Sequence, residues 1–566
     1  MILKSRVSRT TGIMITVLLG SIIFLASCFK KEKFEKVEID PLNHGWGVPI
    51  IDSELSLGDV IRSLDSTKAL TENPDKSYTF TYFDTLSSQT AESYFRLEDQ
   101  QVSESFTLPA GAPLLLPANT PYSNSVQNTE AVSLAAGSQI KSVLFKQGQF
   151  TASFSTTIKH NVTAKLTIAD LKKDNAPFTH TFTSTFSNGN IVAPPARILN
   201  LDGYNLDLTK GNTTTNTLTY TIDYTITGTG QPILPSDNFA LQISLKTLRF
   251  KNMIGNLSAI TSFENFNAST KVSIFDNALD GNVFFEGATV AITADNSFGI
   301  PITLDIQNLQ TTTAYAGTAS TTRRATTTSA AQNFSLTDGN GSAAVGAPTL
   351  AQINSSKLTV YELRKDNSNV EEMIRLAPNK LSYNFIPRLT AGNDQFITDQ
   401  SKLRLYVKVT IPIFAKLEKY VLGDTLGVDK FPARSGDNWK VDSVRLRFKT
   451  TNSIPLDSYT QLYFLDSLGR KIDSLITNPG EFIKRPVINA QGQSIQPTEM
   501  VTIVQMAGER YDNIMSRTKN LYMMSRLLTS KNQNEEQIFI KFLSTNKLRL
   551  EISALAIGQV TIKVNK

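Results

Sequence analysis

A two-residue alternation of apolar and polar side chains constrains the fold of this chain more than any other feature. It is clearest in Leu218–Ile226 and Leu403–Ile413, and it recurs in Val444–Phe448. Successive side chains of a β-strand point to opposite faces, so this pattern gives each strand one buried and one solvated face. Strands of that kind belong to antiparallel sheets. The sequence therefore predicts a mainly β protein of elongated tandem antiparallel β-sandwich domains with a few short helices.

Helical periodicity is confined to short segments. Leu57–Leu64 has apolar residues at helical spacing behind Ser56, which can cap a helix. Val370–Leu376 follows three polar residues that favour a helix start, and it is closed by Pro378. The longest candidate helix runs from about residue 510 to residue 528, where apolar residues form one stripe.

The length of the chain predicts about three or four folded domains. The segment 310–348 is rich in Thr, Ala, Ser and Gly and poor in large apolar residues, which predicts a mobile loop or linker. The expected division is a leader at 1–27, a lipidated tether at 28–45, an N-terminal β region with a short helix at 46–135, a β domain at 136–235, a β domain containing the 310–348 loop at 236–375, and a C-terminal β-sandwich domain with the 510–528 helix at 376–566.

The N-terminal segment has the pattern of a secretory signal that ends at a cysteine. Three basic residues precede the apolar run Gly12–Leu25, and the small residues Ala26 and Ser27 stand before Cys28, the only cysteine of the chain. The pattern resembles the bacterial lipobox, in which signal peptidase II cuts before a diacylglyceryl-modified cysteine. That resemblance implies acylation of Cys28 and attachment to a membrane. The alternative is a transmembrane anchor, which needs about 20 apolar residues, and this run is shorter.

Charge and cysteine content exclude several classes of protein. Removing the three basic residues of the leader from the 56 basic residues leaves 53 against 50 acidic ones, a net charge of +3 with no basic stripe, so nucleic acid is not an expected partner. With Cys28 acylated, no thiol is left for a disulfide or a thiolate metal site. The folded part must therefore be stabilised by core burial.

Two segments share an unusual order of residues. Asn296–Ile306 and Asn452–Tyr463 each follow an alternating strand and read Asn-Ser, then proline, then a second strand. Proline interrupts a ladder of hydrogen bonds, so Pro301 and Pro455 are expected at strand starts or edges. The pattern predicts two related sandwiches, with a poorer third copy at Val143–Leu171. The alternative interpretation is two similar hairpins in unrelated sheets.

The repeated unit resembles the core of LEA-type β-sandwich domains and the repeats of TULIP-type lipid-binding proteins. The whole chain resembles large outer-membrane lipoproteins of Bacteroidota, on the residues Trp46–Ile50, Leu57–Ile61 and Asn452–Ser474. In that phylum acidic residues after the lipidated cysteine mark export to the cell surface. Here lysines at 30, 31 and 33 outnumber Glu32, so a periplasm-facing location is favoured over the cell surface.

Motifs for catalysis or metal binding are scarce. The three histidines, His44, His160 and His180, stand far from one another and from Cys28, which does not suit a zinc or copper site, and we expect the two in the strands to be solvated. No nucleophile elbow, phosphate-binding loop or dinucleotide fingerprint occurs. We therefore expect no metal, no cofactor and no enzymatic turnover, although paired carboxylates for glycoside hydrolysis need no local motif.

Three functions fit these observations. The first is a non-catalytic binding or assembly factor of the cell envelope, held in the outer membrane by palmitate-type chains on Cys28. The second is a carrier of lipid or another apolar ligand, as the TULIP-like resemblance implies, with Met523 and Met524 on a helical lid. The third is a glycan-binding surface lipoprotein. The expected partners are the membrane and an envelope protein or lipid.

Overall fold

The structure is a computed structural model that describes residues 42–56, 70–109, 112, 115–135, 137–257, 263–272, 275, 278–314, 319–328, 334–390, 392–427, 439–476, 480–531 and 536–560. Strands account for 63% of it and helices for 5%. All strand pairs within the described residues are antiparallel, in several sheets, which confirms the predicted fold class. The leader, Cys28, nearly all of the tether and the Leu57–Leu64 helix lie outside the described residues.

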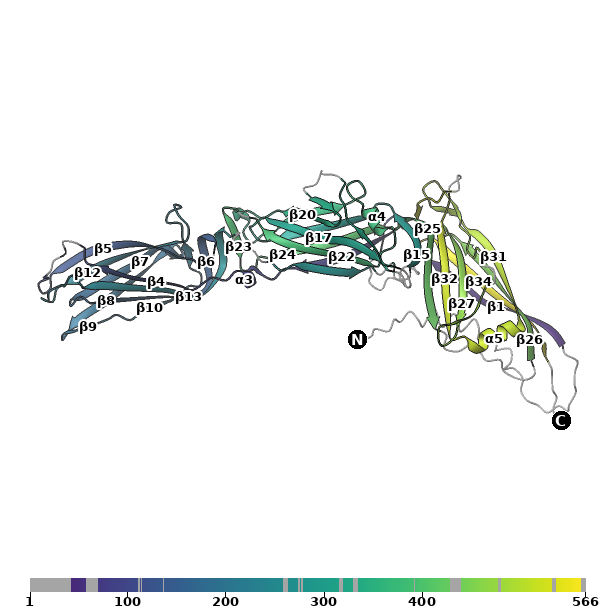
Figure 1. Ribbon diagram of the computed structural model, residues 1–566, viewed down its shortest axis with the longest axis horizontal. Coiled ribbons are helices and arrows are strands. Elements are labelled where there is room, and N and C mark those ends of the chain that lie inside the picture. Colours follow the sequence, from purple (N-terminus) through teal and green to yellow (C-terminus); the bar gives the residue numbers. More distant parts are fainter. Residues whose placement is uncertain are drawn as a thin grey trace, which may run out of the picture.

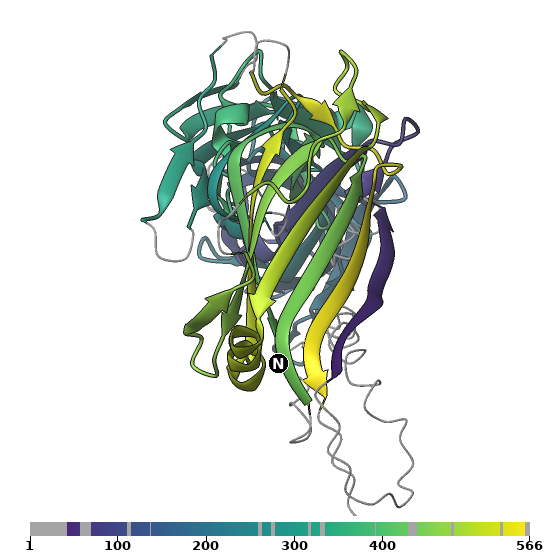
Figure 2. The same ribbon diagram turned by 90° about the vertical axis from the view of Figure 1, so that its right-hand side faces the viewer.

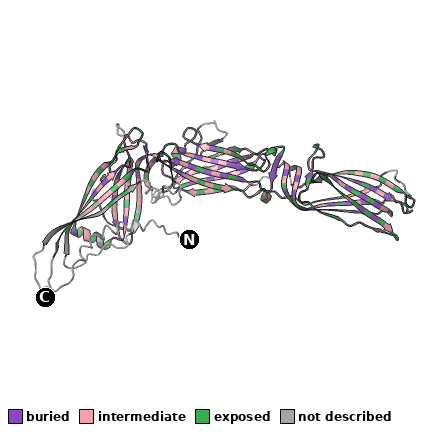
Figure 3. Ribbon diagram, turned by 180° about the vertical axis from the view of Figure 1, so that it is seen from behind, coloured by how far each residue is buried: buried purple, intermediate pink, exposed green. Residues whose placement is uncertain are grey.

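Three β-sandwiches follow one another in a long rod, with the third set at an angle to the other two (Figures 1 and 2). We call them sandwiches I, II and III, from left to right in Figure 1. Along most strands, buried side chains alternate with exposed ones, as Figure 3 shows by colour. Each of these strands thus has one face packed against a core and one face exposed to water, as the alternation in the sequence predicts.

Sandwich I pairs two sheets that the short strand β11 (Asn205–Asp207) joins. The first has the order β4 (Gln100–Thr107), β13 (Asn238–Asn256), β6 (Gln139–Thr156), β10 (Arg197–Asn200). The second has the order β5 (Pro121–Ala131), β12 (Thr217–Thr227), β7 (Asn161–Lys173), β8 (Ala176–Ser187), β9 (Asn190–Val192).

Sandwich II has the same construction. Its first sheet has the order β2 (Leu70–Glu72), β3 (Tyr78–Ser87), β24 (Leu403–Pro412), β16 (Thr289–Asn296), β21 (Lys357–Leu363). Its second sheet has the order β14 (Phe266–Lys271), β22 (Lys380–Leu389), β17 (Ile302–Thr313), β20 (Asn340–Val345), β19 (Phe334–Thr337), with β18 (Thr321–Arg324) also beside β17.

Sandwich III contains both the first and the last strand of the described chain. Its first sheet has the order β1 (Leu42–Ser56), β34 (Lys547–Val560), β26 (Trp439–Asn452), β31 (Thr498–Ala507). Its second sheet has the order β15 (Ala278–Phe285), β25 (Phe414–Gly427), β32 (Asn520–Thr529), β27 (Leu456–Leu465), β28 (Lys471–Ser474), with β33 (Ile540–Lys541) beside β25. The short strands β29 (Val487–Ile488) and β30 (Ser494–Gln496) form a separate two-stranded sheet.

Helices are short within the described residues. They are α3 (Ala91–Tyr94), α4 (Val370–Ile374) and α5 (Gly508–Arg517), with one 3-10 turn, η3 (Leu350–Gln352). The helix expected at Val370–Leu376 is therefore confirmed. No helix in the described part of the chain is long and apolar enough to cross a membrane.

The sandwiches are nested in the sequence instead of following one another. The chain contributes β1 to sandwich III, then β2 and β3 to sandwich II, and then forms sandwich I from β4 to β13. It returns through sandwich II with β14 to β24, of which β15 pairs into sandwich III and β23 pairs into sandwich I, and it completes sandwich III with β25 to β34. The expected boundaries after 135, 235 and 375 do not follow this pairing, because periodicity identifies a strand but not the distant strand that it pairs with.

The three sandwiches repeat one strand order. The sheet orders β4-β13-β6-β10, β3-β24-β16-β21 and β1-β34-β26-β31 correspond strand by strand along the chain. So do β5-β12-β7-β8, β14-β22-β17-β20 and β25-β32-β27-β28. In sandwiches II and III, α4 and α5 each precede the corresponding strands β22 and β32. The expected repeat is confirmed, including its third copy, which falls on β6 and β7.

A polar corner marks the same place in each repeat, where the chain leaves the first sheet for the second. Asn296 and Asn452 end β16 and β26, and each is at most 1% exposed. Their side-chain oxygens accept the backbone N–H of Phe298 at 2.9 Å and of Ile454 at 2.8 Å. In sandwich I the hydroxyl of Thr156 accepts the N–H of Ile158 at 3.1 Å. The expected strand starts are confirmed, since β17 and β27 each begin one residue after the proline.

The next residue of each corner, Thr157, Ser297 or Ser453, ties the corner to the last strand of its sandwich. The hydroxyl of Ser297 accepts the N–H of Lys402 at 2.7 Å, and that of Ser453 accepts the N–H of Lys547 at 2.6 Å. The Thr157 hydroxyl accepts the N–H of Asn238 at 2.9 Å. A hydroxyl at this position therefore satisfies a backbone group that the sheet ladder leaves open.

The described residues of the predicted mobile segment 310–348, which are 310–314, 319–328 and 334–348, instead form parts of sandwich II. They include the end of β17 and the strands β18, β19 and β20. The buried hydroxyls of Thr311 and Thr313 donate to the carbonyls of Met373 and Leu376, at 2.6 and 3.0 Å. Small side chains such as Ala325 and Ala343 are also buried here. The prediction was wrong because threonines and alanines can complete a core that other segments supply.

The predicted helix at about 510–528 is correct only in its first half. α5 ends at Arg517, and Asn520–Thr529 forms β32 between β25 and β27. Leu521 is buried in this strand, whereas Met523 is 39% exposed. The helical stripe was misleading because pairing on both edges of β32 overrides local periodicity. The hypothesis that Met523 and Met524 lie on a helical lid is therefore also wrong, because both residues lie within the central strand β32.

Each joint of the rod is crossed by a strand that belongs in sequence to sandwich II. β23 (Gln395–Thr398), between β22 and β24, pairs with β13 of sandwich I. β15, between β14 and β16, pairs with β25 of sandwich III. At the joint between sandwiches I and II, the Nζ of Lys146 also lies 2.7 Å from a carboxylate oxygen of Asp399 and 3.2 Å from one of Glu92. These shared ladders couple the sandwiches mechanically.

We expect Gly299→Ala to weaken the joint between sandwiches I and II. Its added Cβ would clash with the ring of Phe396, which is fully buried, while the Gly299 N–H donates to the Phe396 carbonyl at 2.8 Å. Overpacking of this kind costs about 1–3 kcal/mol. Thermal unfolding and small-angle scattering of the rod would measure the loss. Gly346→Ala is the control, because its Cβ approaches only the flexible Lys357 and Thr359 side chains at 3.3 Å or more. Equal melting temperatures of the two variants would contradict the expectation.

Candidate functional site: the hydroxyl face of sandwich I

One outward face of sandwich I carries almost only hydroxyl, amide and charged side chains. It belongs to the sheet β5-β12-β7-β8, whose apolar residues point into the core. We call it the hydroxyl face, formed by Ser123, Ser125, Gln127, Thr129, Thr163, Lys165, Thr167, Thr179, Thr181, Thr183, Thr219, Thr221, Asp223 and Thr225. The local cause is the two-residue alternation itself, with threonine at most of the solvated positions.

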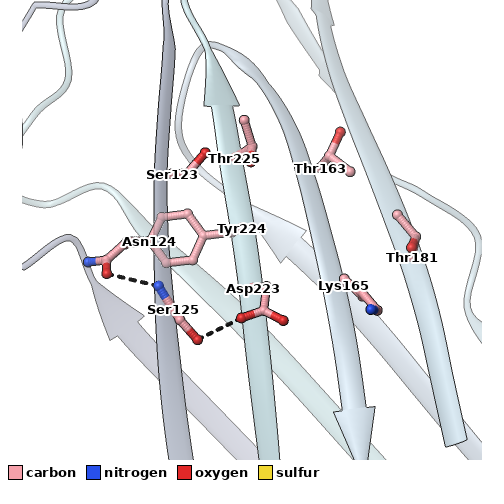
Figure 4. A pocket seen from close by; sticks show the side chains of 9 residues that line it. All are labelled: Ser123, Asn124, Ser125, Thr163, Lys165, Thr181, Asp223, Tyr224 and Thr225. Atoms are coloured by element: carbon pink, nitrogen blue, oxygen red, sulfur yellow. Dashed lines mark hydrogen bonds between the residues drawn. The ribbon is translucent and has the colours of Figure 1, made fainter.

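The strands place these side chains in straight rows across the sheet. Ser125, Asp223, Lys165 and Thr181 are register partners on β5, β12, β7 and β8. The Ser125 hydroxyl donates to Asp223 at 2.7 Å (Figure 4). In the next row the hydroxyls of Ser123 and Thr225 lie 2.8 Å apart. Lys165 forms no ion pair with any residue that the structure describes, so its ammonium group is available to a ligand.

An open hollow of about 530 Å³ lies over this part of the face. Its lining combines the two rows with Asn124 and the ring of Tyr224 (Figure 4). Tyr224 is 2% exposed, and burial raises the pKa of its hydroxyl. The hollow therefore offers hydroxyl groups, one carboxylate and one ammonium, which suit a ligand that is itself rich in hydroxyl groups.

A carboxyl pair lies at the open side of sandwich I, between the edge strands β4 and β5. Burial raises the pKa of Glu130, and the neighbouring Glu104 carboxyl, which is hydrogen-bonded to it, raises that pKa further. Burial also raises the pKa of the nearby Tyr220 to about 12. The proximity of the two carboxyl groups therefore disfavours their being charged together.

The structure separates the histidines named from the sequence. His160 is fully buried, its Nδ1 accepts the N–H of Thr229 at 2.9 Å, and burial lowers its pKa. The expectation that His160 is solvated was wrong, because its side chain is buried in the turn between β6 and β7 and is hydrogen-bonded to Thr229. His180 lies on β8 with its ring edge-on to Phe182, 4.7 Å between centroids. His44 falls in β1, and its side chain is outside the described set. Over the described ranges, no cluster of three or more His, Cys, Asp or Glu could hold a metal ion.

The sequence contained the signal for this face without revealing its extent. The solvated residues of Leu218–Ile226 were visible as threonines and an aspartate, but nothing local indicated that β5, β7 and β8 would extend them into rows. Cys28, the one site residue expected from the sequence, lies outside the described residues.

Solved structures that align with most of this chain do so at low sequence identity and low TM-score. No protein-family model matches the chain, and no curated protein matches it. Among solved structures, a candidate secreted protein from Parabacteroides distasonis ATCC 8503, a member of the Bacteroidota, aligns over 91% of this chain and 99% of its own. Its sequence identity is 9% and its TM-score is 0.25. The VP2 subviral particle of infectious bursal disease virus aligns over 76% of this chain and 83% of its own, with 8% identity and a TM-score of 0.12. At these scores the alignments do not establish a shared fold.

Proposed function

We propose that this chain is a lipid-anchored outer-membrane lipoprotein that acts as a non-catalytic binding or assembly factor of the cell envelope. Cys28 would hold it in the membrane, and the lysine-rich start of the tether favours the periplasmic side. The observation that carries the proposal is the nesting of the sandwiches. It puts the strand nearest to Cys28 in sandwich III and the hydroxyl face in sandwich I, at the opposite end of the rod (Figure 1).

The chain between the cysteine and the rod is short. β1 begins at Leu42, so the residues after Cys28 span at most about 50 Å when fully extended. The first residues of β1, in purple in Figure 1, lie at the end of sandwich III that points away from sandwich II. An acylated Cys28 would therefore keep sandwich III near the membrane and present sandwich I outward. Such an arrangement suits a protein that holds a binding surface at a distance from its membrane.

A polar glycan is the second candidate ligand, and the hollow of the hydroxyl face favours it. Hydroxyl groups, Asp223 and Lys165, which has no ion-pair partner among the described residues, match the hydrogen-bonding groups of a sugar chain. The apolar-carrier alternative has less support. Large side chains such as Phe145, Phe239 and Phe385 fill the sandwich interiors and are less than 2% exposed, and every residue that lines the hollow described above carries a hydroxyl, amide or charged group.

We expect Lys165→Ala and Asp223→Ala to weaken glycan binding at least tenfold, because each removes a charged hydrogen-bonding group from the hollow. Co-sedimentation of the mature chain with peptidoglycan sacculi, and binding to outer-membrane polysaccharide, would measure the affinity. Lys357→Ala, an exposed lysine on β21, is the matched control and should bind as the unaltered chain does. Absence of binding to either polymer would remove the glycan candidate. Lipid that copurifies in native mass spectrometry would favour the carrier.

A further inference from the structure

The strand β5 forms a long free edge of sandwich I. It pairs with β12 over Pro121–Ala131 without a register shift, and within the described residues no strand lies on its other side. The longer edge strand β1 differs, because its register shifts beside Pro49. In natural proteins a lysine, a proline or a bulge usually keeps an edge strand from pairing with another chain. β5 has proline only at its first position, one charged residue, Glu130, and no bulge.

The hydrogen bonds at the two ends of β5 identify which backbone groups face the open side. The N–H of Gly228 donates to the carbonyl of Thr120, and that of Val132 donates to the carbonyl of Asn216, both at 2.9 Å. Even-numbered residues of β5 therefore bond to β12, and odd-numbered residues direct their N–H and C=O groups outward. In agreement, the N–H of Ser125 donates to the side chain of Asn124 at 2.8 Å instead of to β12.

The sequence of β5 is nearly symmetric about Val126. Moving outward from that residue, Ser125 matches Gln127, Asn124 matches Asn128, Ser123 matches Thr129, and Tyr122 matches Glu130. In an antiparallel pair of two such strands centred on Val126, each residue would face its counterpart. Hydroxyl then opposes hydroxyl at Ser123 and Thr129, amide opposes amide at Asn124 and Asn128, and the remaining pairs, Ser125 with Gln127 and Tyr122 with Glu130, bring no like charges together. This complementarity with itself singles out one partner for the edge.

We propose that two copies of this chain associate through their β5 edges, antiparallel and centred on Val126. Ser125 and Gln127 of one copy form hydrogen-bonded pairs with Gln127 and Ser125 of the other, and the local bond from Ser125 to Asn124 is exchanged for a bond between strands. Such a contact is isologous, as a two-fold dimer requires. It also joins the two hydroxyl faces into one continuous sheet surface, so the dimer presents twice the area to a ligand.

Charge substitutions on the outward-facing side chains test both the edge and its register. We expect S125K/Q127K to raise the dimer dissociation constant at least tenfold, because lysine then opposes lysine twice across the two-fold axis. S125K/Q127E should keep the dimer, because each lysine then opposes a glutamate. Ser125→Pro should also give a monomer and remain folded, because the N–H that proline lacks is not bonded to β12. Sedimentation velocity of the mature chain over a range of concentrations measures each constant, and circular dichroism checks the fold.

Two results would overturn the proposal. One is an unaltered chain that stays monomeric at every concentration. The other is a dimer that survives S125K/Q127K and is lost on V501K/I503K, which alters the exposed apolar side chains of the edge strand β31 in sandwich III. Equal effects of S125K/Q127K and S125K/Q127E would contradict the register centred on Val126. None of these measurements depends on acylation of Cys28 or on glycan binding, so they stand apart from the tests of the proposed function.

Discussion

Cys28→Ala is expected to abolish acylation and leave an unprocessed precursor. The expectation rests on the run of small residues before the only cysteine of the chain, since the thiol is the group that takes the lipid. Each buried CH₂ of an acyl chain contributes about 0.8 kcal/mol to membrane attachment, and stable anchoring needs two chains or a second signal. Labelling of cells with radioactive palmitate, followed by separation of precursor and mature chain, measures the effect.

The control for this experiment is Ser27→Ala, which keeps a small residue before the cysteine and should label and mature normally. A Cys28→Ala variant that still takes up label would contradict lipid anchoring, and with it the outward presentation of sandwich I. The strand pairing of the three sandwiches, which lies within the described residues, is tested separately from that outcome.

The polar corners are expected to be sensitive positions within the folded part. Asn452→Ala removes the amide that donates to the carbonyls of Ile454, Leu456 and Lys484, at 2.8, 3.2 and 3.0 Å. Each buried group left without a partner costs about 1–3 kcal/mol, so a loss of about 3 kcal/mol is expected. For a sandwich of this size that lowers the melting temperature by roughly 6–12 °C. Asn296→Ala should behave alike in sandwich II.

The corresponding corner of sandwich I, where Thr156 takes the place of asparagine, provides a graded comparison for this prediction. Thr156→Val in sandwich I should cost less, because the Thr156 hydroxyl accepts one N–H and donates to one carbonyl, that of Asn238. Asn267→Ala, at an exposed position of β14, is the neutral control. Calorimetry that resolves the unfolding of the three sandwiches would measure each change. If Asn296→Ala unfolds at the same temperature as Asn267→Ala, the corners do not stabilise the fold as described.

The features that could be predicted from the sequence are those with a local physical cause. A period of two gives a strand with one wet face, and proline after Asn-Ser gives a strand start, so β17 and β27 could be placed from Pro301 and Pro455. Repetition of the Asn-Ser corner indicated the repeated sandwich. In sandwich I, Thr156 and Thr157 serve the same purpose with different side chains, which is why that copy looked poorer.

The features that could not be predicted depend on pairing between distant segments. Nothing in Leu42–Ser56 indicates that its partner is Lys547–Val560 at the far end of the chain. The spacing of Leu521, Met524 and Leu528 suits a helix, yet strands on both sides make it a strand. The hydroxyl face likewise exists only once β5, β12, β7 and β8 lie side by side. Its residues could be recognised as solvated but not as one surface.

The nested order of the sandwiches has a mechanical consequence. In an ordinary tandem array one peptide linker joins each module to the next. Here the chain passes each joint once outward and once on its return, and β23 and β15 each add a further excursion across one joint. A pulling force along the rod is therefore divided among several covalent connections at each joint, and separated crossings resist torque that a single linker would allow. A single proteolytic cut in any one crossing also leaves the outer sandwiches attached. A rod built in this way can transmit load from its tip to its base while keeping the orientation of its outermost face.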